Sequence, residues 1–321
     1  MEERELGGTG VGVTRLTLGC GNFGGIGSAP ELFGQGETRE QAFELMDAAW
    51  DAGIRMFDTA ASYGGGRSET WIGEWMRAHR RRPVLATKVF HSVTGDPHDR
   101  GLAPDRIRRE LHASLERLAV DRVDLYLIHE PDPETPLSES LTALDALVGE
   151  GLVGAIGASN VDAAYLEEAL ATSERLGLAR FEWVQNSYSL LDRAAGRELL
   201  PLCERRGLGF TPFGPLSGGW LAGRYRRGEP PPGGSRMTLR PEPYEHLRAD
   251  RVYDALDRLS ELAAARGVDS ATVAFAWLLA DDRVTSVVTG PRRPAQLEPA
   301  VRALELRLTP AELDELERLF A

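Results

Sequence analysis

The chain has 321 residues, with 37 Lys and Arg against 49 Asp and Glu, so its formal net charge is −12. Hydrophobic residues make up 42% and charged residues 27% of the sequence, which is ordinary for globular proteins and argues against a disordered or fibrous chain. Because nucleic acids and anionic membranes are negatively charged, the acidic balance disfavours both as partners. We expect neither.

Cysteine usage and hydropathy narrow the class further. Only Cys20 and Cys203 occur, which excludes a disulfide scaffold and a cysteine-based zinc module. The N-terminal sequence MEERELGG lacks the apolar stretch of a signal peptide. The most apolar window, residues 271–280, is too short to cross a bilayer. These features predict a cytoplasmic protein.

Eight short apolar segments alternate with longer amphipathic ones. Such strands, apolar on both faces, are typical of a parallel sheet covered by helices. The count of eight favours a (β/α)₈ TIM barrel of the α/β class over a doubly wound sheet. The predicted strands are residues 15–19, 54–58, 84–88, 123–129, 153–159, 181–186, 208–213 and 284–288.

Helix signals lie between these strands. Thr38 with Gln41, and Thr309-Pro310 with Glu312, have the spacing of capping boxes at helix starts. A helix from Pro104 places apolar residues on one stripe, and a later helix does the same. The stripes are Ile107, Leu111, Leu115 and Leu118, and then Leu141, Leu144 and Val148.

The chain is longer than a minimal barrel of roughly 250 residues. We assign the excess to an N-terminal β-hairpin around residues 5–14, a long loop after the seventh strand from Phe213 to about Tyr244, and a C-terminal helix. Since the Pro- and Gly-rich stretch at 228–234 lies inside the seventh unit, we interpret it as part of an active-site loop. No linker divides the chain, so we predict a single domain, residues 1–321.

Residues 19–24, GCGNFG, match the G-x-G-x-x-G pattern of dinucleotide-binding folds. That pattern requires a helix opening at the glycines, whereas the next predicted helix begins near Thr38. A flexible turn after the first strand is therefore the better interpretation, although its glycines could let a cofactor approach the backbone.

Four chemically useful side chains follow three successive strands. Asp58, Lys88 and His129 end predicted strands, and Tyr63 lies in the loop after Asp58. The carboxyl ends of barrel strands meet on one face. There a phenol can donate a proton to a forming alkoxide, a lysine can bring the phenol pKa closer to neutral, a carboxylate can hold the lysine, and an imidazole can orient a carbonyl.

Each of these residues alone also fits an ordinary structural role, as a strand-end ion pair, a packing tyrosine or a buried histidine. Their joint placement favours catalysis. A hydrolase using Asp58 and Glu130 as paired carboxylates is a further reading, but it leaves Tyr63 and Lys88 without a function.

The sequence resembles the aldo-keto reductase superfamily nearly end to end. The resemblance rests on FDTAASYGGGRSE (57–69), VLATKV (84–89), DLYLIHEPDP (124–133), GAIGASN (154–160), QNSYSLLDR (185–193) and GPLSGGWLAGRY (214–225). It implies a barrel that uses NADPH, less often NADH, without a metal. It also implies a catalytic tetrad of Asp58, Tyr63, Lys88 and His129, with Tyr63 as the general acid.

The same resemblance implies cofactor contacts. Ser159, Asn160 and Gln185 match positions that bind the nicotinamide carboxamide, and Phe213 stands where a stacking tyrosine is usual. Gly214, Leu216, Gly219 and Arg224 match the loop around the pyrophosphate. The resemblance further places Gly21, Asn22, Phe23, Asp58, Pro215, Leu221 and Gly290 along the cofactor.

The C-terminal cofactor segment matches least well. Arg292 and Arg293 could bind the 2′-phosphate, with Gln296 as a further polar contact. Pro299 and Ala300 replace a Glu-Asn pair that commonly lies near the adenine, so that contact is absent. We expect NADPH rather than NADH, on the strength of Arg292 and Arg293.

The resemblance leaves the substrate open between a keto-sugar or natural-product intermediate and a general aldehyde. Residues proposed to line the substrate pocket are Phe23, Tyr63, Phe90, His129 and Trp220. An alternative function is a non-catalytic, redox-sensing regulatory subunit of the same fold. The sequence does not determine the oligomeric state or the direction of the reaction.

Overall fold

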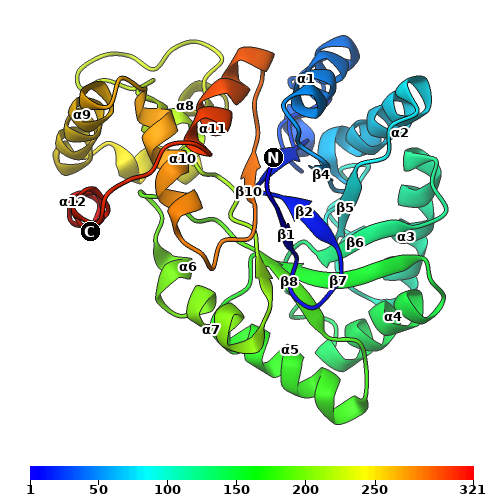
Figure 1. Ribbon diagram of the computed structural model, residues 1–321. Helices are drawn as coiled ribbons and strands as arrows, with labels where there is room; N and C mark the ends of the chain where they lie inside the picture. The colour runs from blue at the N-terminus through cyan, green and yellow to red at the C-terminus, as the bar shows by residue number, and fades with distance from the viewer.

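The computed structural model describes residues 1–321. Eight parallel strands form one curled sheet in the order β10-β3-β4-β5-β6-β7-β8-β9 (Figure 1). All eight predicted strands are present, although several are shorter than expected. Their bounds are β3 Leu16–Gly19, β4 Met56–Asp58, β5 Val84–Val89, β6 Val123–Ile128, β7 Val153–Ser159, β8 Phe181–Gln185, β9 Gly209–Phe210 and β10 Val287–Thr289.

The two edges of this sheet also meet. The backbone N–H of Thr285 donates to the carbonyl of Phe210 at 2.9 Å, and that of Val288 donates to the carbonyl of Pro212 at 2.9 Å. These bonds join the segment leading into β10 to β9 and the residues after it. A closed sheet with no free edge is the (β/α)₈ barrel that the sequence predicts.

Helices surround the barrel, and their starts follow local signals. Thr38 and Thr309 form the predicted capping boxes with Gln41 and Glu312. The longer helices are α1 Arg39–Asp51, α2 Arg67–His79, α3 Pro104–Leu118, α4 Leu137–Gly149, α5 Ala163–Leu176, α7 Leu199–Arg206, α9 Asp250–Ala265, α10 Ser270–Ala280 and α12 Pro310–Leu319. Shorter ones are α6 Ala194–Arg197, α8 Arg236–Leu239 and α11 Glu298–Ala303.

The predicted helix stripes are largely correct. All four apolar residues of the α3 stripe are buried. In α4, however, Leu147 rather than Val148 joins Leu141 and Leu144 in the core. Both positions fall near the same face of a 3.6-residue helix, so the pattern alone left the choice between them open.

A hairpin of β1 (Glu3–Glu5) and β2 (Gly12–Thr14) lies across one end of the barrel (Figure 1). It begins two residues before the predicted start. Leu6 and Val13 from this hairpin join a buried cluster inside the barrel. Inward-facing residues of five strands complete that cluster: Met56, Ala86, Leu125, Leu127, Ala155 and Trp183. This packing fills the N-terminal end of the barrel with side chains, as is usual for a fold whose sites lie at the opposite end.

The long segment after β9 is more ordered than a loop. Besides α8, it contains 3₁₀ turns at Ser217–Ala222 and Glu242–Leu247. Helix α12 lies beside α9 at the left of Figure 1, where Arg258 pairs with Glu315 at 2.7 Å. No single helix is long and apolar enough to cross a membrane, and only α9 and α10 together, bent by 89°, satisfy that test of length and composition.

Candidate active site

The carboxyl ends of three neighbouring strands bring the predicted reactive groups together. Asp58 ends β4, Lys88 lies one residue before the end of β5, and His129 directly follows β6. Tyr63 opens a 3₁₀ turn, Tyr63–Gly66, that returns over these strand ends. That turn contains glycines with positive φ, which other residues rarely adopt.

Lys88 is the centre of the arrangement, and its side chain is fully buried. Its Nζ donates to Asp58 Oδ2 at 2.8 Å, to the carbonyl of Thr59 at 2.8 Å and to the Tyr63 hydroxyl at 3.3 Å. An ammonium group has three protons, so this geometry satisfies all of them. The Tyr63 oxygen accepts one, which leaves the phenolic proton free for another acceptor.

Burial and charge act in opposite directions on these groups. Burial alone would lower the pKa of Lys88, but Asp58 and Tyr63 together raise it above its ordinary value of 10.5, so the ammonium stays charged. Burial raises the pKa of Tyr63 above 10.0 and outweighs the lowering by Lys88. The lysine therefore acts in the expected direction, but the expected net shift toward neutral pH is wrong.

The imidazole of His129 has no hydrogen-bond partner in the protein, and its surroundings favour the neutral form. Burial, followed by the charge of Lys88 and the nearby His91, holds its pKa well below 6.5. Its Nδ1 is buried with no hydrogen bond. The imidazole contacts the rings of Tyr63 and His91, with centroid separations of 5.6 Å and 4.7 Å. The ring thus has fixed neighbours and unused hydrogen-bonding capacity.

A cavity of about 710 Å³ opens over these groups. Asp58, Tyr63 and His129 line it, whereas Lys88 lies behind them. Most of the predicted cofactor residues also line it: Gly21, Asn22, Ser159, Asn160, Gln185, Phe213, Gly214, Pro215, Leu216, Gly219, Arg224, Gly290, Arg292 and Gln296.

Three predicted cofactor residues lie outside the lining. Phe23 and Leu221 are buried in the main hydrophobic core, and Arg293 is exposed to solvent. Phe90 and Trp220, expected in the substrate pocket, also belong to that core. An apolar residue in a motif can serve either the core or the cavity, and periodicity does not distinguish the two.

The predicted amide side chains already have partners. Gln185 Nε2 donates to Asp58 Oδ1 at 3.0 Å, and Asn160 Nδ2 donates to the carbonyl of His129 at 2.9 Å. These bonds position two residues of the reactive group and still leave the amide oxygens as acceptors. Asn160 is held at φ 57°, a conformation that asparagine tolerates better than most residues.

The sequence predicted only two of the four arginines that line the cavity. Arg224 and Arg292 line it as predicted, but so do Arg236 and Arg240 from the segment after β9. Arg236 donates to Asn22 Oδ1, which ties this segment to the loop after β3. Nothing in the local pattern near the PPPGG stretch marks these arginines, because their role depends on how that segment folds back.

Two further polar residues lie at this end of the cavity: His91 was not predicted, and Glu130 was considered only as a paired carboxylate of a hydrolase. His91 Nε2 lies 3.1 Å from Glu130 Oε1, and both residues line the cavity. Hydrogen bonding to His91 is the main cause of the lowered pKa of Glu130. Each lies two residues after a strand end, His91 after β5 and Glu130 after β6, and for His91 that position was the available signal.

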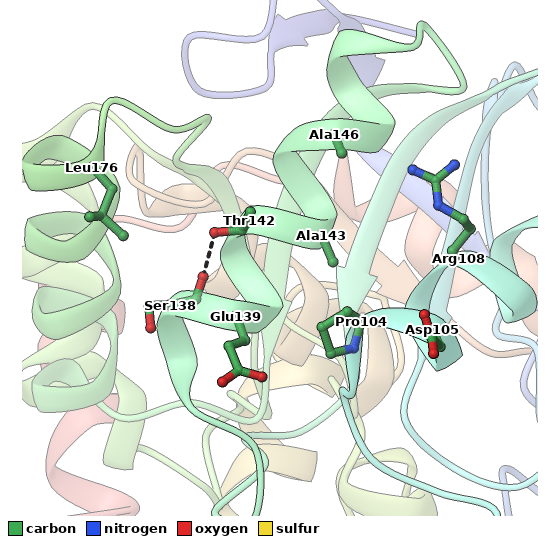
Figure 2. Close-up of a pocket in the computed structure, with 9 residues that line it drawn as sticks. All are labelled: Pro104, Asp105, Arg108, Ser138, Glu139, Thr142, Ala143, Ala146 and Leu176. Atoms are coloured by element: carbon green, nitrogen blue, oxygen red, sulfur yellow. Dashed lines mark hydrogen bonds between the residues drawn. The ribbon is translucent and has the colours of Figure 1, made fainter.

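A second hollow, of about 530 Å³, lies outside the barrel (Figure 2). It is lined by α3, α4 and the end of α5, and it opens widely to solvent. Arg108 there is paired with Glu150 at 2.5 Å, and the Thr142 hydroxyl donates to the carbonyl of Ser138 at 2.7 Å. Since no strand end reaches it, this hollow lacks the convergent groups of the first cavity.

Comparison with known proteins agrees with this geometry. The chain matches the model of the aldo/keto reductase family over residues 15–321. It is 37% identical to the uncharacterized oxidoreductase YrpG of Bacillus subtilis, with 100% of this chain and 96% of that protein covered. It is 33% identical to a probable voltage-gated potassium channel subunit beta of Oryza sativa, covering 99% and 96%. It is 32% identical to the NADH-specific methylglyoxal reductase of Escherichia coli, covering 97% and 96%.

Proposed function

Because this chain belongs to the aldo/keto reductase family and is an NAD(P)H-dependent oxidoreductase that reduces carbonyl groups, we propose that it reduces an aldehyde or ketone with NADPH and that Tyr63 is the proton donor. The observation that supports Tyr63 as the proton donor is the hydrogen bonding of Lys88. Lys88 donates one of its three hydrogen bonds to the Tyr63 oxygen, so the proton of the Tyr63 hydroxyl remains free to be donated.

The residues of the cavity fit a dinucleotide cofactor. Four arginines, Arg224, Arg236, Arg240 and Arg292, offer positive charge for phosphates. The backbone at Gly214 and Gly219 has positive φ, which lets it approach a ligand closely. The ring of Phe213 and the amide oxygens of Asn160 and Gln185 supply a stacking surface and acceptors. Bound NADPH would supply a hydride to the carbonyl carbon.

The protein's own groups complete the reduction. Leaving an N–H buried without an acceptor is more costly than leaving a lone pair unpaired, so we assign the His129 proton to Nε2. From Nε2 it donates a hydrogen bond to the substrate oxygen. The Tyr63 hydroxyl transfers its proton to that oxygen, and Lys88 stabilises the phenolate that remains until it takes a proton from solvent.

The Tyr63→Phe variant tests this assignment. It removes the hydroxyl and keeps the ring, so kcat for 4-nitrobenzaldehyde should fall by about 100-fold or more, while the dissociation constant for NADPH stays unchanged. Tyr165→Phe is the matched control, because Tyr165 lies on α5 away from the cavity, and it should retain full activity. Wild-type activity in Tyr63→Phe would remove Tyr63 as the donor.

We propose NADPH over NADH because Arg292 lines the cavity with Gln296, at the positions that the resemblance assigns to the 2′-phosphate. A cytoplasmic location, a small-molecule substrate and a single domain over residues 1–321 are retained as predictions. A keto-sugar and a general aldehyde are both kept as candidate substrates.

A regulatory subunit is the second candidate, favoured by the similarity to the rice protein named as a probable channel subunit. The two functions differ in turnover. A catalyst releases its oxidised cofactor and continues past the first cycle, whereas a redox sensor reacts once for each bound cofactor. Following NADPH oxidation beyond one equivalent with excess aldehyde decides between them.

A further inference from the structure

Glu37 is a buried carboxylate next to the cavity that none of the reactions above uses. It immediately precedes Thr38, the N-cap of α1. Its backbone N–H donates to the carbonyl of Asn22 at 2.8 Å, and its carbonyl accepts from the N–H of Gly24 at 3.0 Å. These two bonds fix the backbone of Glu37 against the loop after β3, and only 2% of its side chain is exposed.

The carboxylate is only half satisfied. Its Oε1 accepts from Arg292 Nε at 2.8 Å, but its Oε2 is buried with no hydrogen-bond partner. Burial raises the pKa of Glu37, and the bond to Arg292 opposes that rise. A buried carboxylate with one free oxygen is costly, so Glu37 holds Arg292, the cation that it contacts directly, in a strong pair.

Arg292 is consequently a weaker phosphate ligand than its place in the cavity suggests. Its Nε donates to Glu37, and its Nη1 donates to the carbonyl of Gly234 at 2.8 Å. Only Nη2 has no acceptor in the protein. Its charge is also compensated by that of Glu37. The neighbouring Arg236 is held by Asn22, and burial lowers its pKa.

We propose that Glu37 determines the cofactor specificity of this protein: by pairing with Arg292 it opposes a 2′-phosphate there and narrows the preference for NADPH over NADH. A phosphate bound to Arg292 would lie close to the Glu37 carboxylate, and like charges repel strongly at such a buried site. The adenosine 2′-hydroxyl of NADH carries no charge and meets no such repulsion. This inference rests on the proposed function, since it assumes that the cavity binds a nicotinamide dinucleotide.

The test is to measure dissociation constants for NADPH and NADH by quenching of tryptophan fluorescence, without substrate. In the wild type we expect the two constants to differ by less than about tenfold. Glu37→Gln keeps the size of the side chain and an acceptor for Arg292 but removes the charge. It should tighten NADPH binding by about tenfold and leave NADH binding unchanged. The ratio of the NADH dissociation constant to the NADPH dissociation constant should therefore widen.

Glu40→Gln is the matched control. Glu40 is an exposed carboxylate in the first turn of α1, so the substitution makes the same change in net charge without touching the pair, and the ratio should not move. In an Arg292→Gln background, Glu37→Gln should widen the ratio less than it does in the wild type, because the cation whose charge Glu37 compensates is gone and only the direct repulsion between Glu37 and the phosphate is left to remove.

Other outcomes overturn the proposal. An unchanged ratio in Glu37→Gln removes the specificity role, and a reduced ratio shows that Glu37 instead orients Arg292 for phosphate. A wild-type preference for NADPH above about 100-fold contradicts the proposal without any variant. If the wild type binds neither nucleotide, the proposed function itself fails, whereas binding of both with an unmoved ratio removes only the role of Glu37.

Discussion

At the scale of single residues, the unusual feature of this protein is how completely Lys88 is hydrogen-bonded. Its three donors all have acceptors, one of them the oxygen of Tyr63. The residue types and their strand-end positions were readable from the sequence. The net direction of the Tyr63 pKa shift was not, because it depends on the competition between burial and Lys88, and only the folded structure sets the depth of burial.

The pKa directions predict the pH dependence of catalysis. Reduction requires protonated Tyr63 and, in our assignment, neutral His129. The pKa of Tyr63 lies above 10.0 and that of His129 well below 6.5, so both forms dominate in between. We expect kcat/KM for aldehyde reduction to stay flat from about pH 7 to about pH 9.

Alcohol oxidation requires the phenolate of Tyr63 and should instead rise with pH across that range. Steady-state rates in both directions, with cofactor affinity measured at each pH, provide the check. A fall in reduction with a midpoint near pH 7 to 8 would mean that Tyr63 loses its proton more easily than its burial allows.

At the scale of secondary structure elements, a buried ion pair joins α2 to α3. Glu69, on α2, is completely buried and accepts from Arg117 Nε of α3 at 2.6 Å and from the Thr87 hydroxyl of β5 at 2.5 Å. The sequence does not indicate this pair, because the two residues are 48 positions apart and each resembles an ordinary charge on an amphipathic helix.

Removing one partner should therefore destabilise the fold. Arg117→Met leaves the Glu69 carboxylate buried without its cation, and we expect a loss of about 3 to 5 kcal/mol in the free energy of unfolding. The matched control is Arg108→Met, which breaks the exposed pair with Glu150 and should cost far less stability, because solvent screens an exposed ion pair.

Urea unfolding followed by circular dichroism measures both losses. The double variant Glu69→Gln/Arg117→Met should recover part of the stability, since no uncompensated charge then remains buried. Equal losses in the two single arginine variants would show that the Glu69 pair behaves like a surface pair.

At the scale of the whole molecule, the packed hairpin and the cavity with the proposed catalytic groups lie at opposite ends of the barrel. The hairpin closes the N-terminal end with Leu6 and Val13, packed in one cluster with Trp183. The proposed catalytic groups lie at the carboxyl ends of the strands. No side chain of the hairpin cluster lines the cavity. Substitutions in that cluster should therefore leave the cavity intact.

Leu6→Ala tests this separation. Leu6 is completely buried, so the substitution should cost about 2 to 5 kcal/mol of stability. The kcat and KM for an aldehyde, measured well below the unfolding transition, should stay close to wild type. A large change in KM would mean that packing at the hairpin controls the geometry of the cavity.

The sequence by itself determined most of the strands and long helices of this protein, and it predicted which polar side chains gather at the strand ends. Apolar periodicity and capping residues such as Thr38 and Thr309 are local signals that depend on residues a few positions apart. The eight strands and these helix starts can therefore be predicted from short stretches of sequence. The positions of Asp58, Lys88 and His129 at strand ends then follow from the parallel topology, which brings such ends to one face.

The tertiary structure alone decided how these groups are paired. Arg292 meets Glu37 across 255 positions of chain, and Arg236 meets Asn22 across 214. It also decided that Phe23 and Leu221 pack in the core rather than line the cavity. Burial, charge compensation and pKa depend on neighbours that are distant in sequence, and no local pattern encodes which distant segments meet.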